Sequence, residues 1–177
     1  KSPLTGAGGD ANGGGYFGPE LKTSGYDIIL VSGVSQKPVY IHIENGKATL
    51  REAGHLWGKD TVETESLIRK ELREPAVQVA CIGSSGERKS LISCVITDGR
   101  AAARSGLGAV MGSKRLKAVA VRGEEKVPVA NEALFEEISS KIRAKFKRSL
   151  SAQVGERISR PLFSILLRLF GSRTASL

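Results

Sequence analysis

Lys37-Pro-Val-Tyr-Ile-His-Ile-Glu-Asn-Gly-Lys-Ala-Thr-Leu-Arg-Glu52 is the stretch that decides the fold class. Two runs that alternate apolar with polar residues flank the dipeptide Asn45-Gly46. Both residues of this dipeptide accept the positive φ angles of a type I′ turn, whose twist suits the flanking strands. The stretch therefore predicts an antiparallel β-hairpin in which Lys37–Glu44 pairs with Lys47–Glu52.

Apolar runs on either side of the hairpin predict further strands, with one helix among them. Asp60-Thr-Val-Glu63 has the spacing of a capping box, so we expect a helix that begins there and ends near Pro75. No regular alternation of strand and helix runs through the chain, which argues against a Rossmann sheet. The predicted strands are Tyr26–Gly33, Ala76–Ile82, Leu91–Thr97 and Leu116–Val121.

Together these elements predict an α+β fold: a layered domain of mixed or antiparallel sheets with helices, followed by a helical C-terminal tail. We place the domain at residues 1–130, truncated at its start, and the basic tail at residues 131–177. Asn131 is expected to cap a helix that runs to about Arg148. A second apolar run in the tail, Pro161–Phe170, is shorter than the roughly 20 residues of a bilayer span, so no membrane span is expected.

The net charge of +9 is divided between the two parts of the chain. Residues 131–177 hold nine Lys/Arg and four Asp/Glu, which gives +5 and leaves +4 for the first 130 residues. The first 130 residues are therefore only mildly basic, and such a charge suits binding of an anionic small ligand at least as well as binding of nucleic acid. Cys81 and Cys94 do not form a Cys-x-x-Cys pair, which argues against a zinc or iron–sulfur site built from this chain alone. We expect both to be buried structural thiols.

Two glycine-rich basic segments, Ala11–Gly18 and Gly99–Lys114, are the candidate binding elements. Glycine lets the backbone come close to a ligand, and arginine supplies positive charge for phosphate. Although about ninety residues separate them, the two segments predict one anionic cofactor held from two sides. Neither contains a nucleophile, a general base or a metal cluster, so no catalytic residue is assigned. The alternative interpretations are a flexible turn for the first segment and solvated charges for the arginines of the second.

The two histidines are interpreted as structural. His42 alternates with apolar residues of a strand, which is typical of a packed or half-exposed side chain. His55 precedes the predicted helix cap, where a structural hydrogen bond is expected. Neither is assigned as a catalytic base.

Five segments, in order along the chain, carry a resemblance to a known family. They are Ala11-Asn-Gly-Gly-Gly-Tyr-Phe-Gly-Pro-Glu-Leu-Lys22, Gly25-Tyr-Asp27, Lys37-Pro-Val-Tyr40, His55-Leu-Trp-Gly-Lys-Asp-Thr61 and Gly108-Ala-Val-Met-Gly-Ser-Lys114. Over residues 1 to about 130, the chain resembles the N-terminal domain of the aldehyde ferredoxin oxidoreductases. Five ordered segments at nearly the family's spacing are a more specific signal than one glycine-rich loop.

The resemblance implies an enzyme that oxidises aldehydes to carboxylic acids. Members hold tungsten, or sometimes molybdenum, on two pterin cofactors, and electrons leave through a 4Fe-4S cluster to ferredoxin. The cysteine usage leads us to expect a cytoplasmic protein. We expect no nucleic-acid partner, and the sequence leaves open whether the protein is a homo-oligomer. The cluster's cysteine ligands lie downstream in the family and are absent here, so the chain is expected to be a fragment that needs the enzyme's remaining domains for activity.

The resemblance also assigns site residues. In the family, two backbone carbonyls bind a magnesium ion that bridges the pterin phosphates, and the matching positions here are Asn12 and Ala101. The resemblance also implies a pterin contact for Arg100. The planar guanidinium of Arg100 or Arg104 suits a phosphate or a pterin edge better than a lysine would. The full set of cofactor-binding positions is Asn12, Gly14, Arg100, Ala101, Ala103 and Arg104.

Two departures from the family pattern are visible. Ala103 and Ser105 stand where the resemblance expects glycine, so the second segment is expected to lie slightly farther from its ligand.

A different class of function is kept as the alternative: a non-catalytic module that binds a phosphate-bearing ligand or nucleic acid through the same loops. Single-strand recognition is weakened because Tyr16 and Phe17 are the only aromatic residues in these loops.

Overall fold

The computed structural model describes residues 2–148 of the chain. The described chain divides into two compact units, with the division after Val127. The predicted apolar run Pro161–Phe170 lies outside the described residues. In the described part, no helix combines the length and the apolar character needed to cross a bilayer.

The predicted hairpin is confirmed. It consists of β1 (Val39–Glu44) and β2 (Lys47–Glu52), antiparallel and in the register that pairs Glu44 with Lys47. Asn45 and Gly46 have φ angles of 44° and 79°, both positive as a type I′ turn requires. The Asn-Gly dipeptide therefore fixes the register of this pair.

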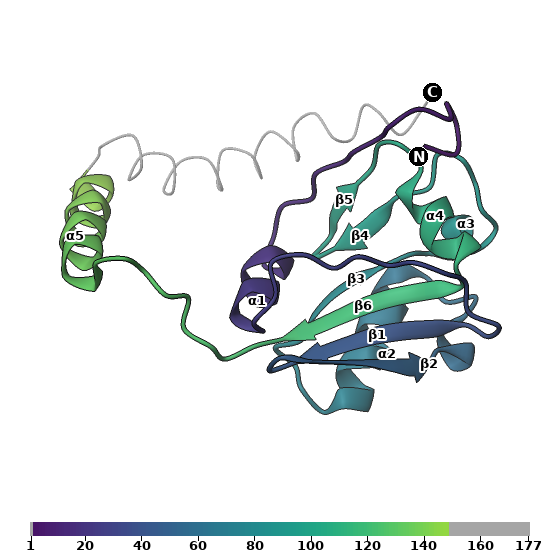
Figure 1. Ribbon diagram of the computed structural model, residues 1–177, viewed down its shortest axis with the longest axis horizontal. Helices are drawn as coiled ribbons and strands as arrows, with labels where there is room; N and C mark the ends of the chain where they lie inside the picture. The colour runs from purple at the N-terminus through teal and green to yellow at the C-terminus, as the bar shows by residue number, and fades with distance from the viewer. Residues whose placement is uncertain (1, 149–177) are drawn as a thin grey trace, which may run out of the picture. The chain divides into compact units, whose positions relative to one another are not determined.

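Six strands form one mixed sheet in the order β2-β1-β6-β3-β4-β5 (Figure 1). β1 and β6 (Leu116–Arg122) are parallel, and every other neighbouring pair is antiparallel. The remaining strands are β3 (Gln78–Cys81), β4 (Val95–Thr97) and β5 (Arg100–Ala102). The predicted α+β class is confirmed, but the predicted strand Leu91–Thr97 is wrong in its first half.

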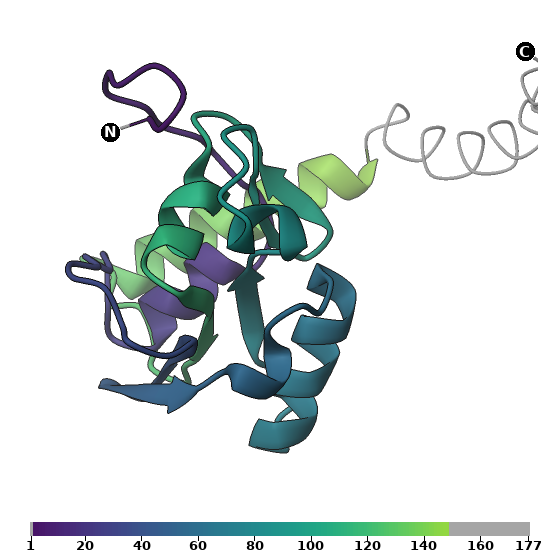
Figure 2. The same ribbon diagram turned by 90° about the vertical axis from the view of Figure 1, so that its right-hand side faces the viewer.

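One face of the sheet is covered by α2 (Thr61–Leu72), which follows a short 3-10 turn, η1 (Gly54–Leu56). The capping box at its start is present: Glu63 N donates to Asp60 Oδ1 at 2.8 Å. The helix ends at Arg73, whose φ of 55° is left-handed. Figure 2 shows α2 on one side of the sheet and α1 on the other. The core beneath α2 includes Tyr40, Leu56, Ile68, Val79 and Ala120.

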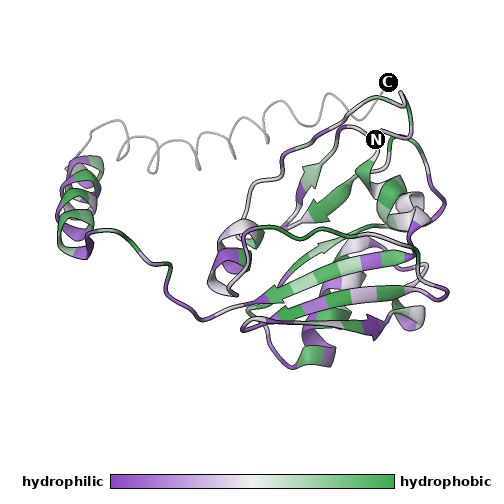
Figure 3. Cartoon of the chain, in the orientation of Figure 1, coloured by the Kyte–Doolittle hydropathy of each residue, from purple (hydrophilic) through white to green (hydrophobic). Residues whose placement is uncertain are grey.

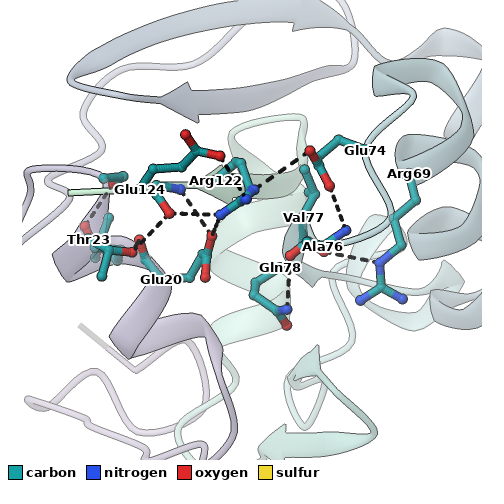
Figure 4. Close-up of polar contacts among 12 residues, drawn as sticks. Glu20, Thr23, Arg69, Glu74, Ala76, Val77, Gln78, Arg122 and Glu124 are labelled. Carbon is teal, nitrogen blue, oxygen red and sulfur yellow. Dashed lines mark hydrogen bonds and ion pairs between the residues drawn. The ribbon is translucent and has the colours of Figure 1, made fainter. Parts of the chain in front are cut away.

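The opposite face is covered in part by α1 (Phe17–Thr23), which the sequence did not predict. Figure 4 shows how its position is fixed: Glu20 Oε1 accepts from Arg122 Nη1 and from Gly123 N, each at 3.0 Å. The helix end also lies directly on Gly123, where a Cβ would be 2.1 Å from Ser24 N. α1 is therefore locked to the end of β6.

The predicted strand Tyr26–Gly33 is wrong. The segment crosses the α1 face of the sheet without pairing with any strand, and Figure 3 shows it as an apolar stretch between α1 and β1. Ile29 and Val31 pack on the core of this face, whereas Ile28 and Leu30 are 78% and 91% exposed. A sequence that is apolar on both faces predicts burial on both, and the described chain covers only one.

Two short helices, α3 (Ser84–Glu87) and α4 (Leu107–Ser113), pack against each other. Their contact requires glycine, because a Cβ on Gly112 would lie 1.9 Å from the carbonyl oxygen of Gly86. The sequence predicted a turn at Gly83–Gly86 and left residues 101–112 open between helix and loop. In the structure, residues 101–112 comprise the end of β5, a connection and most of α4.

The second unit contains α5 (Glu132–Arg148). Leu134 N donates to Asn131 Oδ1 at 3.0 Å, so the predicted N-cap is confirmed. Its apolar residues are about half exposed or more; they are Leu134, Phe135, Ile138, Ile142 and Phe146.

Candidate cofactor-binding surface

The two glycine-rich segments lie against each other in the first unit. The second begins as a hairpin, because Asp98 and Gly99 have φ angles of 49° and 67° and connect β4 to β5. The first segment runs along this hairpin toward α1 (Figure 1). A Cβ added to Gly13 would contact Ala102 N at 3.7 Å, and one on Gly14 would approach Arg100 Cδ to 3.2 Å.

Asp98 connects the two segments, and the sequence interpretation missed it. Its Oδ2 accepts a hydrogen bond from Tyr16 N at 2.8 Å. The same oxygen lies where a Cβ on Gly15 would come within 2.7 Å, so this contact requires glycine. Asp-Gly between two β-prone runs is a signal for a type I′ hairpin and could have located this turn.

Ser105 makes a second connection, at the far end of the same two segments. Its Oγ donates to the carbonyl oxygen of Asp10 at 3.1 Å. Its φ is 68°, a left-handed value that explains why the resemblance expects glycine at this position. The serine hydroxyl thus makes a connection that a glycine could not.

Other glycines of the second segment serve packing within the domain. A Cβ on Gly106 would lie 2.3 Å from Leu91 O, and one on Gly108 would lie 2.6 Å from Cys94 O. With Gly112 against α3, these contacts fix α4 directly behind the second segment. We expected the glycines of this segment to let a ligand come close to the backbone. At Gly106, Gly108 and Gly112 this expectation is corrected, because packing within the domain requires glycine there.

All six predicted cofactor-binding residues are exposed on this surface. Arg100 makes one long contact, Nη1 to the carbonyl oxygen of Asp98 at 3.5 Å. Arg104 makes no polar contact within the described part of the chain. It borders a pocket of about 450 Å³ whose apolar lining includes Leu91 and Ile92. Two guanidinium groups that form no ion pair within residues 2–148 therefore face solvent here, and this is the electrostatic arrangement that an anion needs.

Buried beneath the first segment is a polar group without a partner. Thr97 is 8% exposed, and its Oγ1 makes no hydrogen bond within the described residues. Its Cγ2 lies 3.8 Å from the Cβ position of Gly13. Among the described residues, no group of three or more His, Cys, Asp or Glu could hold a metal ion. Oxygen groups at this surface that suit a hard cation include backbone carbonyls, the Asp98 carboxylate and the hydroxyls of Thr97 and Ser105.

Four residues were interpreted as structural: the two histidines and the two cysteines. His42 is buried on β1, and burial lowers the pKa of its imidazole. His55 Nε2 lies 3.0 Å from Glu71 Oε2, the structural hydrogen bond that was expected. Cys81 is buried, and this burial raises the pKa of its thiol to about 12. Cys94 is only half-buried, which corrects the expectation for that residue.

Comparison with known proteins identifies the family to which this chain belongs. The family model described as "Aldehyde ferredoxin oxidoreductase, N-terminal domain" matches residues 1–123. The chain belongs to the aldehyde ferredoxin oxidoreductase family.

Individual relatives agree with this assignment. The tungsten-containing aldehyde ferredoxin oxidoreductases of Pyrococcus furiosus and Thermococcus kodakarensis are 52% and 51% identical over 136 residues. Each match covers 76% of this chain and 22% of the relative, so the chain spans about a fifth of their length.

Other relatives carry different names. The WOR-like subunit of an aliphatic sulfonate oxidoreductase from Pyrococcus furiosus is 36% identical, over 63% of this chain and 20% of its own. A solved structure of the active site complex BamBC of benzoyl coenzyme A reductase is 42% identical with a TM-score of 0.73. That match covers 77% of this chain and 21% of the solved chain. The same domain therefore occurs in proteins named for at least three reactions.

Proposed function

We propose that this chain is the cofactor-binding N-terminal part of an oxidoreductase that oxidises aldehydes to carboxylic acids, with ferredoxin as electron acceptor. In this proposal residues 1–130 hold a tungsten or molybdenum ion carried by two pterins, and residues 131–177 form a separate tail. The 4Fe-4S cluster, the aldehyde pocket and the ferredoxin contact belong to parts of the enzyme outside this chain. Family membership supports the oxidoreductase class, and the names of the relatives support tungsten.

One observation carries the cofactor assignment. Segments about ninety residues apart in the sequence meet at one exposed surface, where the guanidinium groups of Arg100 and Arg104 form no ion pair with any described residue. An arginine left without an acid beside a glycine-rich backbone suits a phosphate-bearing ligand. The residues present therefore fit a pterin that carries phosphate.

Each residue has a binding or orienting role in this proposal. Arg100 and Arg104 donate hydrogen bonds to phosphate or to a pterin edge. The backbone carbonyls of Asn12 and Ala101 are oxygen ligands for Mg²⁺. The bound metal and pterins supply the redox chemistry, and the protein orients them and adjusts their electrostatics. Gly14 and Ala103 add backbone groups with little or no side chain in the way.

The test replaces Arg100 by alanine in the polypeptide of the natural open reading frame, produced in a host that supplies tungsten and pterin. Loss of a charge-assisted hydrogen bond costs about 1.5–3 kcal/mol, so cofactor affinity should fall roughly tenfold or more. Tungsten and organic phosphate per chain are measured after extensive dialysis. The matched control is Arg88→Ala, because Arg88 is also exposed and also lacks an ion pair within the described residues.

Unchanged metal and phosphate in Arg100→Ala would remove this residue from the site. The alternative, a module that binds nucleic acid through the same arginines, makes a separate prediction. It requires oligonucleotide binding that weakens steeply with salt, together with an absence of tungsten, molybdenum and pterin.

A further inference from the structure

Residues 26–34 have the sequence of a β-strand, but most of their backbone groups make no hydrogen bond with the described residues. No amide of residues 27–34 donates a hydrogen bond within the described part of the chain. Among the carbonyls of the same residues, only that of Gly33 accepts one, from Lys114 Nζ at 3.0 Å. Backbone polar groups that become buried in a folded protein are almost always paired. The Ile-Ile-Leu-Val stretch therefore offers a free row of donors and acceptors.

The side chains of this segment divide into an inner and an outer set. Ile29 and Val31 pack against the core on the α1 face of the sheet. Ile28 and Leu30 alternate with them and are 78% and 91% exposed. Alternation of this kind is the pattern of a strand whose two faces both meet apolar layers. The described chain supplies only the inner layer.

A groove lies beside the exposed side chains Ile28 and Leu30. It has a volume of about 420 Å³ and runs between this segment and the β1–β2 hairpin. Leu50, which is 71% exposed, lies on the hairpin side of the groove. Contiguous exposed apolar surface of this kind marks an interaction site. The apolar residues that line it include Ile28, Leu30, Ile41, Ile43, Ala48 and Leu50.

We propose that residues 27–32 are a docking strand. A β-strand with alternating apolar side chains, supplied by the enzyme polypeptide outside residues 1–177, pairs with its backbone, covers Ile28 and Leu30, and fills the groove. Recognition is β-strand addition: main-chain hydrogen bonds give affinity, and the groove accepts alternate side chains. The pairing of the two strands needs no cofactor, so it can be tested independently of the proposed cofactor binding.

The relatives are long enough to supply such a strand, and a strand left unpaired promotes aggregation. The relatives match over 22% of their length, so 78% of each lies outside the matched region, ample for one strand. A tethered strand is present at high effective concentration. An unpaired apolar strand left open is a template for aggregation, which natural proteins avoid by covering it.

Hydrogen exchange of the natural open reading frame's polypeptide tests this directly. The amides of residues 28–31 should exchange more than about a hundredfold more slowly than the unpaired amides of Gly8 and Gly9, and at rates close to those of β1. Exchange at the rate of Gly8 and Gly9 would overturn the proposal, and this measurement needs no substitution. Protection that appears only as protein concentration rises would also overturn it, because the occupant would then be a second copy.

A pair of substitutions tests the outer face. Leu30→Lys places a charge where the incoming strand would lie and should return residues 28–31 to fast exchange. Val62→Lys is the matched control, since Val62 is 76% exposed on α2 and distant in sequence from the docking strand. If Leu30→Lys leaves the protection of residues 28–31 unchanged, the outer face is not an interface and the proposal is wrong.

Discussion

At the residue scale, Asp98 fixes one end of the contact between the two glycine-rich segments. Asp98 sits in the turn between β4 and β5, and its carboxylate holds the amide of Tyr16 at 2.8 Å. Tyr16 immediately precedes α1, which is itself locked to β6 by Glu20 and Arg122. The first segment is thus fixed at the end that leads into α1. Asp98 is a positioning residue in this account and contacts no ligand.

Asp98→Ala should separate the segments without unfolding the domain. A hydrogen bond to a charged acceptor contributes about 1.5–3 kcal/mol, so the free energy of unfolding should fall by that amount. Tungsten per chain should fall as well, because Arg100 would no longer be held beside the first segment. Denaturant unfolding and metal analysis of the same preparations measure both effects.

Asp27→Ala is the control for this prediction. Asp27 forms an exposed ion pair with Lys22, so its removal should change stability by less than about 1 kcal/mol and leave metal content unaltered. A variant Asp98→Ala that keeps its full tungsten content would show that the hydrogen bond to Tyr16 does not position the site.

At the element scale, a buried ion pair supports the helices behind the second segment. Lys117 on β6 is fully buried, and its Nζ lies 2.5 Å from Glu87 Oε1 on α3. The Glu87 carboxylate also accepts from Gly58 N at 3.0 and 2.9 Å, and Lys117 Nζ donates to the Lys59 carbonyl at 2.8 Å. Every group in the cluster is paired, which is what makes such burial tolerable.

Glu87→Gln should therefore be among the most damaging conservative changes in the domain. It leaves the Lys117 ammonium buried without its counter-charge, and breaking a buried pair in this way costs about 3–5 kcal/mol. Glu52→Gln is the control, because the Lys37–Glu52 pair is about three-quarters exposed and should be worth less than about 1 kcal/mol. Equal unfolding free energies for the two variants, measured in urea, would refute this role.

Elements that carry local signals could be predicted from the sequence. The Asn45-Gly46 hairpin, the capping box at Asp60 and the cap at Asn131 all occur as expected. Each depends on residues only a few positions apart. α1 was missed because Gly18 and Pro19 favour a turn in isolation, although proline is well tolerated in a first helical turn.

The elements that failed depend on distant partners. Tyr26–Gly33 has the pattern of a strand, but a strand also needs a neighbour, and none of the described residues supplies one. At the candidate surface, Arg100 and Arg104 were predicted from their charge beside glycine. Asp98 was missed because its partner, Tyr16, is 82 residues away and contributes only a backbone amide. The sequence shows no side-chain pattern for such a contact.

At the scale of the whole molecule, the chain has the features of one part of a larger enzyme. Its first unit exposes a glycine-rich surface with two arginines. It also exposes an apolar segment, residues 27–32, whose backbone has no strand partner among the described residues. The chain spans about a fifth of the length of its relatives. These relatives are named as an aldehyde ferredoxin oxidoreductase, an aliphatic sulfonate oxidoreductase and a benzoyl coenzyme A reductase. A domain that serves several reactions is expected to hold what they share, and the substrate is expected to be selected elsewhere.

The central claim is that this surface holds two phosphate-bearing pterins around one metal. Its most direct test is elemental analysis of the polypeptide from the natural open reading frame, made in a host that supplies tungsten, molybdenum and pterin. The account predicts one tungsten or molybdenum per chain and two organic phosphates per metal. A folded protein that contains neither metal nor pterin under these conditions would contradict the account and leave a non-catalytic anion-binding module.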